Sequence, residues 1–239
     1  MTGTLYLVPN LLGVAAPDDV LPARTIAIAQ RLTHFAVETP KVARAFLKTL
    51  SPQRVIADIA MVACDPLDSA VAQCAAWLKA GLEVGVISDA GCPGMADPGA
   101  VFVSVAHRLG ATVVPLVGPS SVLLGLMASG FDGQHFVFHG YLPSKPTERD
   151  KVLKLLEKVV REKGTTQAFI ETPYRNAVLL AAICENVSSV SLCAAQNLGS
   201  ANERIASKAV RDWTALDRER FAGKEPTLFL LGNSQTSGG

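Results

Sequence analysis

Apolar residues in the first half of the chain alternate between short runs typical of buried strands and stretches at helical spacing. We predict strands at 5–9, 34–38, 55–62, 83–88 and 112–117. Between them, apolar residues three or four positions apart predict helices at 21–32, 41–50, 68–79 and 99–109. Asp68 is the expected N-cap of the third helix. This alternation predicts a mostly parallel sheet covered by helices on both faces.

From Gly118 onward the pattern changes, because the connections between the last predicted strands become short. Helices are expected at 120–129, 147–163 and 176–184, and strands at 135–139, 167–171, 190–195, 206–213 and 226–231. The fold class is therefore α/β with two α/β domains, 1–118 and 119–239. The first has a mostly parallel sheet, the second a mixed or antiparallel one, and a ligand cleft is expected between them. The polar tail 232–239 should fray.

Composition fits a compact globular protein, since 49% of the 239 residues are hydrophobic and 18% are charged. The net charge of +1 gives no global attraction to nucleic acid or to acidic membranes, so a polyanionic partner would need a local patch. Residues 145–163 hold seven basic and four acidic side chains. They form either a solvated helix face with ion pairs such as Glu157 with Arg161, or a patch that faces phosphates.

Metal and membrane signals are weak. The five cysteines are odd in number and never spaced C-x-x-C, which favours reduced thiols over disulfides or a zinc knuckle. His135 and His139 would lie roughly 13 Å apart on one face of a strand, too far for one ion. Prolines and serines interrupt the longest apolar run, 113–131, and no basic segment precedes the first strand. We expect a cytoplasmic protein without metal or membrane contact.

Two glycine-rich turns carry the strongest functional signal. The first holds glycines at 91, 94 and 99 after strand 83–88, and the second is Gly118-Pro119-Ser120-Ser121 after strand 112–117. A strand followed by a glycine-rich turn and a helix brings bare backbone to a small ligand at the carboxyl ends of a parallel sheet. Neither turn is a dinucleotide fingerprint or a P-loop, so neither NAD nor ATP is the leading ligand.

Individual side chains in these turns can have either a ligand-binding role or a helix-capping role. Asp89 stands at a strand end and is expected to contact a ligand, whereas Asp97 is expected to be an N-cap with Pro98 at the first helical position. Ser120 and Ser121 open a helix whose N–H groups suit an anionic group, although one serine could simply be the cap.

A third patch, 169–175, ends a predicted strand with Glu171 and continues to Arg175. This segment is either a turn that faces the substrate or a salt-bridged surface turn without a ligand.

The turns also match a known family. Ser88-Asp89-Ala90-Gly91-x-Pro93, Asp97-Pro98-Gly99 and Val114-Pro115-Leu116-x-Gly118-Pro119-Ser120 together resemble the tetrapyrrole-methylase superfamily of S-adenosylmethionine-dependent methyltransferases. The branch most similar is the bacterial small-subunit ribosomal RNA ribose 2′-O-methyltransferases. That match adds Gly3–Pro9, Glu38-Thr39 and Phe138-x-Gly140-Tyr141-Leu142-Pro143, so the resemblance covers the whole chain.

The resemblance implies that S-adenosylmethionine lies between the two domains and that the chain is a homodimer acting on ribosomal RNA or the small ribosomal subunit. The residues that it implies at the cofactor are Pro9, Asp89, Gly91, Cys92, Ser120, Ser121, Ile170 and Glu171. Methyl transfer to a hydroxyl also needs a base or a polarising cation, because the protein must align donor and acceptor and remove a proton. The candidates for these catalytic roles are Glu38, Glu171 and Arg175.

Several family motifs are altered on the substrate side. Asn10-Leu11-Leu12-Gly13 replaces Pro-Ile-Gly-Asn-Leu, Glu38-Thr39-Pro40-Lys41 replaces Glu-Asp-Thr-Arg, and 195–199 lack the charges of Arg-Glu-Leu-Thr-Lys. Two alternatives therefore stay open: a methyltransferase for a small, tetrapyrrole-like acceptor, and a non-catalytic module that binds the cofactor or RNA. The Gly-x-Gly-x-Gly-Asp turn of tetrapyrrole methylases is missing after the first strand, which counts against the first alternative.

Overall fold

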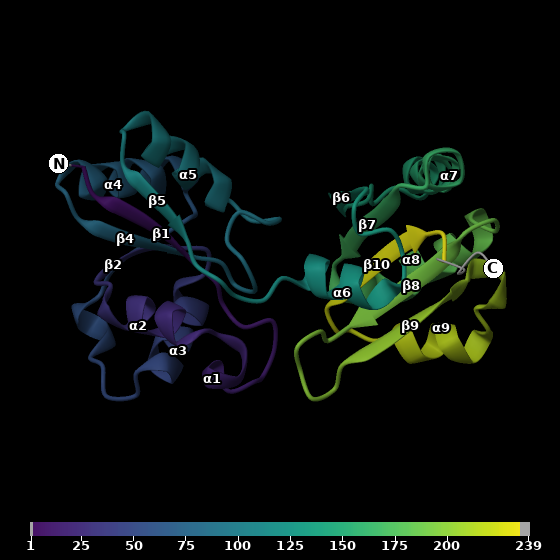
Figure 1. Cartoon of the computed structure of the whole chain (residues 1–239), viewed down its shortest axis with the longest axis horizontal. Helices are drawn as coiled ribbons and strands as arrows, with labels where there is room; N and C mark the ends of the chain where they lie inside the picture. Colours follow the sequence, from purple (N-terminus) through teal and green to yellow (C-terminus); the bar gives the residue numbers. More distant parts are fainter. Residues whose placement is uncertain (1, 235–239) are drawn as a thin grey trace. The chain divides into compact units, whose positions relative to one another are not determined.

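A computed structural model describes residues 2–234 of the 239-residue chain (Figure 1). Contacts within the chain divide it into two compact units, Met1–Ser120 and Ser121–Gly239. Each unit contains one five-stranded sheet, as predicted for a fold of two α/β domains.

The first unit is built on a parallel sheet with strand order β3-β2-β4-β1-β5. Its strands are β1 (Thr4–Val8), β2 (His34–Val37), β3 (Ala60–Ala63), β4 (Glu83–Ile87) and β5 (Thr112–Pro115). Apolar residues fill β1 and β4 almost without interruption, because both strands are interior and both of their faces are covered.

Helices cover both faces of this sheet (Figure 1). α2 (Ala23–Arg31) and α3 (Pro40–Leu50) pack on one face, after the short α1 (Pro17–Val20), while α4 (Leu67–Lys79) and α5 (Gly99–Arg108) pack on the other. The helices that follow β1 and β2 thus lie on one face of the sheet. The helix that follows β4, which lies between those two strands, is on the opposite face. Neighbouring strands with this property form the crevice in which open α/β sheets bind ligands.

The cores on the two faces are closely packed. Phe35 is fully buried against α2 and α3, and Phe102 of α5 is fully buried on the other face. A Cβ atom at Gly85 would lie 2.5 Å from the Phe35 ring, so only glycine lets this ring rest on β4.

The second unit has a mixed sheet with strand order β6-β7-β10-β8-β9. Its strands are β6 (Phe136–Tyr141), β7 (Thr166–Glu171), β8 (Ser191–Gln196), β9 (Arg204–Ala209) and β10 (Thr227–Gly232). β6 and β7 are parallel, since the long helix α7 connects them, and the remaining pairs are antiparallel.

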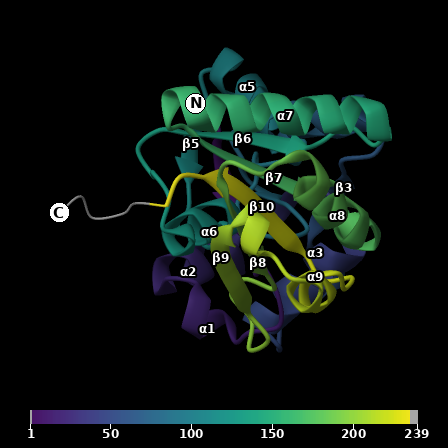
Figure 2. The ribbon, with the colours of Figure 1, turned by 90° about the vertical axis from the view of Figure 1, so that its right-hand side faces the viewer.

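Three helices cover one face of the second sheet and a single short helix packs on the other. The three are α7 (Pro146–Lys163), α8 (Asn176–Asn186) and α9 (Ala215–Phe221), and the short one is α6 (Ser121–Ser129). Figure 2 shows α7 lengthwise. The Phe169 and Phe229 rings stack at 6.1 Å under the three helices, and Gly125 lets α6 approach the sheet, since a Cβ there would lie 2.4 Å from Leu228.

Several element predictions were wrong in detail. The segment 55–62 is a 3-10 turn at Ile56–Asp58 followed by the short β3, and the predicted strand 206–213 is β9 followed by a 3-10 turn at Val210–Asp212. α1 and α9 were not predicted. Asp68 lies in the first turn of α4, whose N-cap is Pro66.

Side-chain pairing on α7 also differs from the prediction. Glu157 does not pair with Arg161, because its Oε1 accepts the backbone N–H groups of Ser188 and Ser189 at 2.8 and 2.6 Å. Fraying was predicted for 232–239, but Gly232 is the last residue of β10, and the prediction for 235–239 lies outside the described residues. Within residues 2–234, none of the helices has the length and apolarity needed to cross a bilayer.

Candidate active site at the carboxyl edge of the parallel sheet

The loops that follow β1, β2, β4 and β5 meet at one edge of the first sheet. Because the strands are parallel, their carboxyl ends lie at the same edge. This edge carries Pro9, Glu38, Asp89 and Gly118, each of which the sequence placed at the end of a strand.

Asn10 ties the loop after β1 to the loop after β4. Its Nδ2 donates to the carbonyls of Ser88 at 3.2 Å and Asp89 at 3.1 Å, and its backbone N–H donates to Gly91 O at 2.9 Å. Asn10 is only 5% exposed, so these bonds satisfy a buried amide. Sequence reasoning treated Asn10 only as a departure from the family motif. A polar residue directly after a buried strand was the available signal.

Asp89 ties the same loop to the end of β2. Its carboxylate accepts the Thr39 backbone N–H at Oδ1 (3.1 Å) and the Thr39 hydroxyl at Oδ2 (2.7 Å). In return, the Asp89 N–H donates to Glu38 Oε2 at 2.9 Å. The predicted ligand-binding carboxylate is thus hydrogen-bonded within the protein, and the reciprocal bonds orient Glu38.

Glu38 lies in a carboxylate-rich environment. Burial raises the pKa of its carboxyl above the usual value, and the charges of Asp89 and Asp97 raise it further, while the hydrogen bond from the Asp89 N–H opposes them. Burial and the same three carboxylates raise the pKa of the nearby Cys64 thiol to about 11. A carboxyl group with a raised pKa among like charges is typical of a functional site.

The glycine loop itself is organised by Asp97. Its carboxylate accepts the N–H groups of Gly94 at 2.8 Å, Met95 at 3.2 Å and Gly99 at 2.7 Å. The prediction that Asp97 is the N-cap of the following helix was wrong in position, because α5 begins at Gly99 with Pro98 as its N-cap. Its structural role is to hold the loop in shape.

Close backbone contacts join the loops after β1, β4 and β5. A Cβ at Gly118 would lie 2.2 Å from Pro9 Cγ, so only glycine allows this contact. Gly91 has φ +67°, which glycine adopts without strain. The Cys92 thiol lies 3.3 Å from the carbonyl oxygen of Pro119, and burial raises its pKa, so Cys92 is a neutral donor.

The structure thus brings together Pro9, Glu38, Asp89, Gly91 and Cys92. Ser120 follows Pro119 and is half-buried, and Ser121 is the first residue of α6 in the second unit. Across the described residues, no group of three His, Cys, Asp or Glu side chains is arranged to hold a metal ion.

Ile170 and Glu171 in the second unit point to opposite faces of their sheet, because they are adjacent on β7. Ile170 packs beside α6. Glu171 is 5% exposed and lies on the face covered by α7, α8 and α9, where its Oε1 accepts the Thr172 N–H at 2.7 Å. The two side chains cannot line one ligand from the same side.

Arg175 forms an ion pair with Glu171, with Nη2 3.2 Å from Oε2, but the two groups are not aligned as a hydrogen bond. The turn therefore contains a salt bridge, and a contact of this turn with the substrate stays a prediction. The ion pair ties both side chains to the turn.

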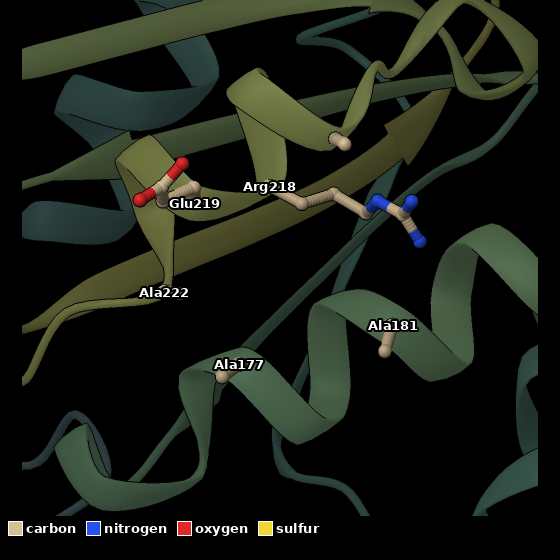
Figure 3. Close-up of a pocket in the computed structure, with 6 residues that line it drawn as sticks. Ala177, Ala181, Arg218, Glu219 and Ala222 are labelled. Atoms are coloured by element: carbon tan, nitrogen blue, oxygen red, sulfur yellow. The ribbon is translucent and has the colours of Figure 1, made fainter.

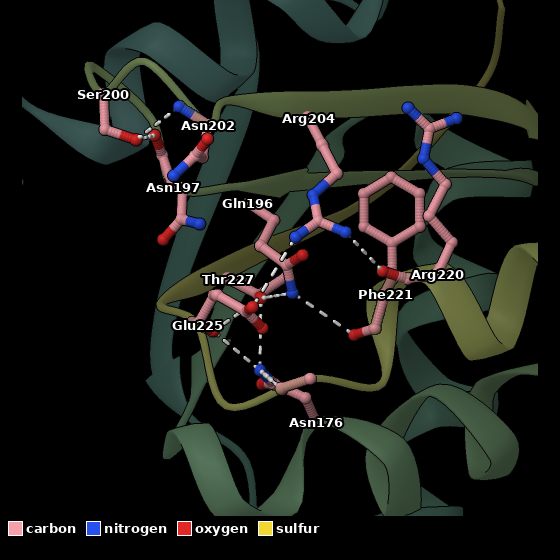
Figure 4. A network of polar contacts seen from close by, with 11 residues as sticks. Asn176, Gln196, Asn197, Ser200, Asn202, Arg204, Arg220, Phe221, Glu225 and Thr227 are labelled. Carbon is pink, nitrogen blue, oxygen red and sulfur yellow. Dashed lines mark hydrogen bonds and ion pairs between the residues drawn. The ribbon is translucent and has the colours of Figure 1, made fainter.

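Beside Glu171, a buried polar network crosses the second sheet (Figure 4). Asn176 Nδ2 donates to Gly223 O at 2.9 Å and to Glu225 O at 2.8 Å, and Gln196 Nε2 donates to Thr227 Oγ1 at 3.0 Å. The network fixes the chain between α9 and β10. Sequence reasoning missed it, since single Asn, Gln and Thr residues give no spacing signal.

A shallow pocket of about 250 Å³ lies between α8 and α9 (Figure 3). It is lined by Ala177, Ala181, Ala215, Arg218, Glu219 and Ala222. None of the predicted site residues lines it.

No protein-family model matches the chain. Several curated proteins, however, are similar to it in sequence. Ribosomal RNA small subunit methyltransferase I of Neisseria meningitidis serogroup B is 30% identical over 98% of this chain and 77% of its own length. The protein of the same name from Bacillus subtilis is 29% identical over 91% of this chain and 72% of its own length.

Solved structures share the fold. The methyltransferase CobJ matches with a TM-score of 0.62 at 19% identity, covering 100% of this chain and 96% of CobJ. Uroporphyrin-III-C-methyltransferase from Thermus thermophilus matches with a TM-score of 0.58 at 17% identity, covering 98% and 94%.

The fold and the glycine loops therefore define a methyltransferase of the tetrapyrrole-methylase fold, which needs a methyl donor. Within that class, the chain belongs to the ribosomal RNA small subunit methyltransferase I family. The resemblance noted in the sequence is confirmed.

Proposed function

We propose that this protein transfers a methyl group from S-adenosylmethionine to ribosomal RNA of the small subunit, at a ribose 2′-hydroxyl. The observation that carries the proposal is the 30% identity, over 98% of the chain, to a protein named for that substrate. S-adenosylmethionine supplies a methyl group on a cationic sulfonium.

The carboxyl edge of the first sheet fits such a donor. Glu38, Asp89 and Asp97 concentrate negative charge there, and the charges of Asp89 and Asp97 add to burial in raising the Glu38 pKa. A cationic sulfonium suits a carboxylate-rich edge, because opposite charges attract strongly where water is partly excluded. Backbone near Gly91 and Cys92 can approach the cofactor closely, since no side chain intervenes at Gly91.

We assign Asp89 a positioning role, because its carboxylate accepts two hydrogen bonds from Thr39 and its backbone N–H donates to Glu38. A direct contact between Asp89 and the cofactor stays a prediction. Pro9, Gly91, Cys92 and Ser120 complete the proposed contacts in the first unit. The contacts expected at Ser121, Ile170 and Glu171 stay predictions.

Glu38 is the proposed general base. A base works best when its pKa lies near the working pH, and the Glu38 pKa is shifted in that direction. The Asp89 N–H holds Oε2, which leaves Oε1 to accept a proton from the acceptor hydroxyl. Catalytic roles for Glu171 and Arg175 stay predictions, and their ion pair favours a role in fixing the turn.

The test is calorimetric titration of the purified protein with S-adenosylmethionine, followed by transfer of a labelled methyl group. Three acceptors should be compared: small ribosomal subunits, protein-free small-subunit RNA and a uroporphyrin-type tetrapyrrole. Label in RNA that survives base hydrolysis as a 2′-O-methyl nucleotide supports the proposal. Label in the tetrapyrrole alone supports the small-molecule alternative.

A cofactor-binding module without catalysis would bind S-adenosylmethionine but transfer no label to any acceptor. Glu38→Gln separates this case, because a working enzyme should lose far more turnover than cofactor affinity, which falls only by the loss of one of three nearby carboxylates. A cytoplasmic homodimer is part of the proposal. It is supported by the exposed apolar residues Leu123 and Met127 on α6, at 54% and 80% exposure, and sedimentation showing only a 25.2 kDa species would contradict it.

A further inference from the structure

One surface of the second unit combines exposed positive charge with acids that are already paired. It lies on α7, the 18-residue helix that Figure 2 shows lengthwise. The buried residues Arg149, Leu153, Leu156 and Val160 fix the inward side of the helix. Lys151, Lys154 and Lys158 lie on its exposed side, three or four positions apart.

All four acidic residues of α7 have partners. Glu148 lies 3.3 Å from Lys145, Asp150 lies 3.1 Å from Arg149, and Glu162 lies 3.9 Å from Lys158. The fourth, Glu157, turns inward to accept backbone N–H groups.

Four cations of this segment stay unpaired. Within the described residues, Lys151, Lys154, Arg161 and Lys163 have no carboxylate oxygen within 4.0 Å. The segment therefore presents a local positive patch on a protein whose net charge is only +1.

The length of the patch suits a polyanion with regularly spaced charges. From Lys151 to Arg161 the helix rises roughly 15 Å, at about 1.5 Å per residue. Phosphates along a nucleic-acid strand are also regularly spaced, a few ångströms apart, like the basic side chains along the helix. Lysine contacts to phosphates give affinity without reading the base sequence. Lysine and arginine side chains can reach several phosphates while their stems stay on the helix.

We propose that the exposed face of α7, formed by Lys151, Lys154, Lys158 and Arg161, docks the phosphate backbone of the RNA substrate. The inference rests on the proposed function for its partner. It adds a surface for RNA on the second unit, apart from the carboxyl edge of the first sheet. Docking there positions the RNA and raises affinity, and the chemistry stays with the first unit.

The test compares two double variants that each remove two exposed positive charges. Lys151→Gln/Lys154→Gln changes the α7 face, and Lys79→Gln/Arg108→Gln is the matched control on exposed positions of the first unit. For each protein, the affinity for a small-subunit RNA transcript is measured by filter binding across a series of KCl concentrations. Circular dichroism and S-adenosylmethionine affinity check that folding and the donor site are intact.

The α7 variant should bind RNA roughly 2- to 30-fold more weakly, if each contact is worth as much as an exposed ion pair. Its plot of log affinity against log salt should flatten by about 2 units, one for each lost phosphate contact. In methyl transfer, KM for RNA should rise while kcat and S-adenosylmethionine affinity stay unchanged, and the control variant should match the wild type.

An equal loss of RNA affinity in both double variants would overturn the proposal, because it would show that RNA binding depends only on the net charge of the protein. An unchanged salt slope in the α7 variant would overturn it too. If the wild type methylates RNA and the α7 variant binds RNA normally, the docking surface is wrong and the proposed function stands. If the wild type binds RNA through α7 but transfers no methyl group, the proposed function fails and the surface stands.

Discussion

The Asp89 carboxylate accepts both the backbone N–H and the hydroxyl of Thr39, at 3.1 and 2.7 Å. These two residues follow neighbouring parallel strands, β4 and β2, whose chains continue to opposite faces of the sheet. The contact therefore joins the ends of β2 and β4 and holds Glu38, the residue before Thr39, against the Asp89 N–H.

Removing either partner of this contact should destabilise the first unit. We expect Asp89→Ala and Thr39→Val each to lower the free energy of unfolding by about 1–3 kcal/mol, because each leaves hydrogen-bonding groups without partners. Urea denaturation measures the change. Thr39→Ser keeps both bonds and is the control.

The same variants distinguish a structural role of the Asp89 carboxylate from a direct contact between this carboxylate and the methyl donor. If its carboxylate contacts the donor directly, Asp89→Ala should lose far more S-adenosylmethionine affinity than Thr39→Val. Similar losses in the two variants would support the positioning role.

A second prediction concerns pH. Because the Glu38 pKa is raised in the folded protein, the folded state binds a proton more tightly than the unfolded state. The resulting stabilisation is complete below the ordinary value of 4.5 and is lost as pH rises through the folded-state pKa. Glu38→Gln cannot titrate, so its unfolding free energy should fall less over that range.

Urea unfolding of both proteins from pH 4 to pH 8 gives the comparison. Parallel pH profiles for wild type and Glu38→Gln would contradict the shifted pKa. In the same range, kcat of the wild type should rise with pH as Glu38 loses its proton, since only the carboxylate can act as a base.

The sequence predicted the parallel sheet well because its strands carry dense apolar runs between glycine and proline turns. It missed α9, whose charged sequence around Asp217 and Arg218 shows little helical periodicity. That short helix is fixed instead by its Thr214 capping box and by Phe221, which is buried under it. The burial of a single side chain in the folded protein produces no pattern in the neighbouring sequence.

At the site, strand-end position correctly indicated which residues gather, but not how their side chains are used. Asp89 was expected to face a ligand, and its actual partner is Thr39, fifty residues earlier in the chain. Likewise, the sequence did not show that the side chains of Ile170 and Glu171 face opposite sides of their sheet, and contacts of these residues with a ligand stay predictions. Side-chain partners that are distant in sequence were the main information that the sequence did not provide.

A third prediction tests the contact between the loops after β1 and β5. Gly118→Ala would place a Cβ 2.2 Å from Pro9 Cγ, so the loops must separate. We expect a loss of about 1–3 kcal/mol in stability, as for other overpacked sites. Reduced S-adenosylmethionine affinity should accompany it, measured by calorimetry on protein that is still folded.

Gly133→Ala is the control for this substitution. The nearest atom to a Cβ there is 4.0 Å away, so its stability should stay within about 0.5 kcal/mol of the wild type. An equally mild effect at Gly118 would mean that the loops are free to adjust.

The last prediction uses cysteine reactivity to report the charge around Glu38. Burial raises the pKa of the Cys64 thiol to about 11, and the carboxylates of Glu38, Asp97 and Asp89 contribute to the shift. Since the thiolate is the reactive form, Cys64 should react slowly with a maleimide at pH 8. Mass spectrometry of the labelled peptides resolves it from the other cysteines.

Glu38→Gln should speed the labelling of Cys64, because it removes one of the negative charges that disfavour the thiolate. Cys184 in the second unit is the internal control, since its pKa is also raised by burial but no Glu38 charge acts on it. Equal acceleration at Cys64 and Cys184 would indicate general loosening of the fold. Acceleration at Cys64 alone would establish that Glu38 is ionised and close to Cys64, as a carboxylate-rich donor site requires.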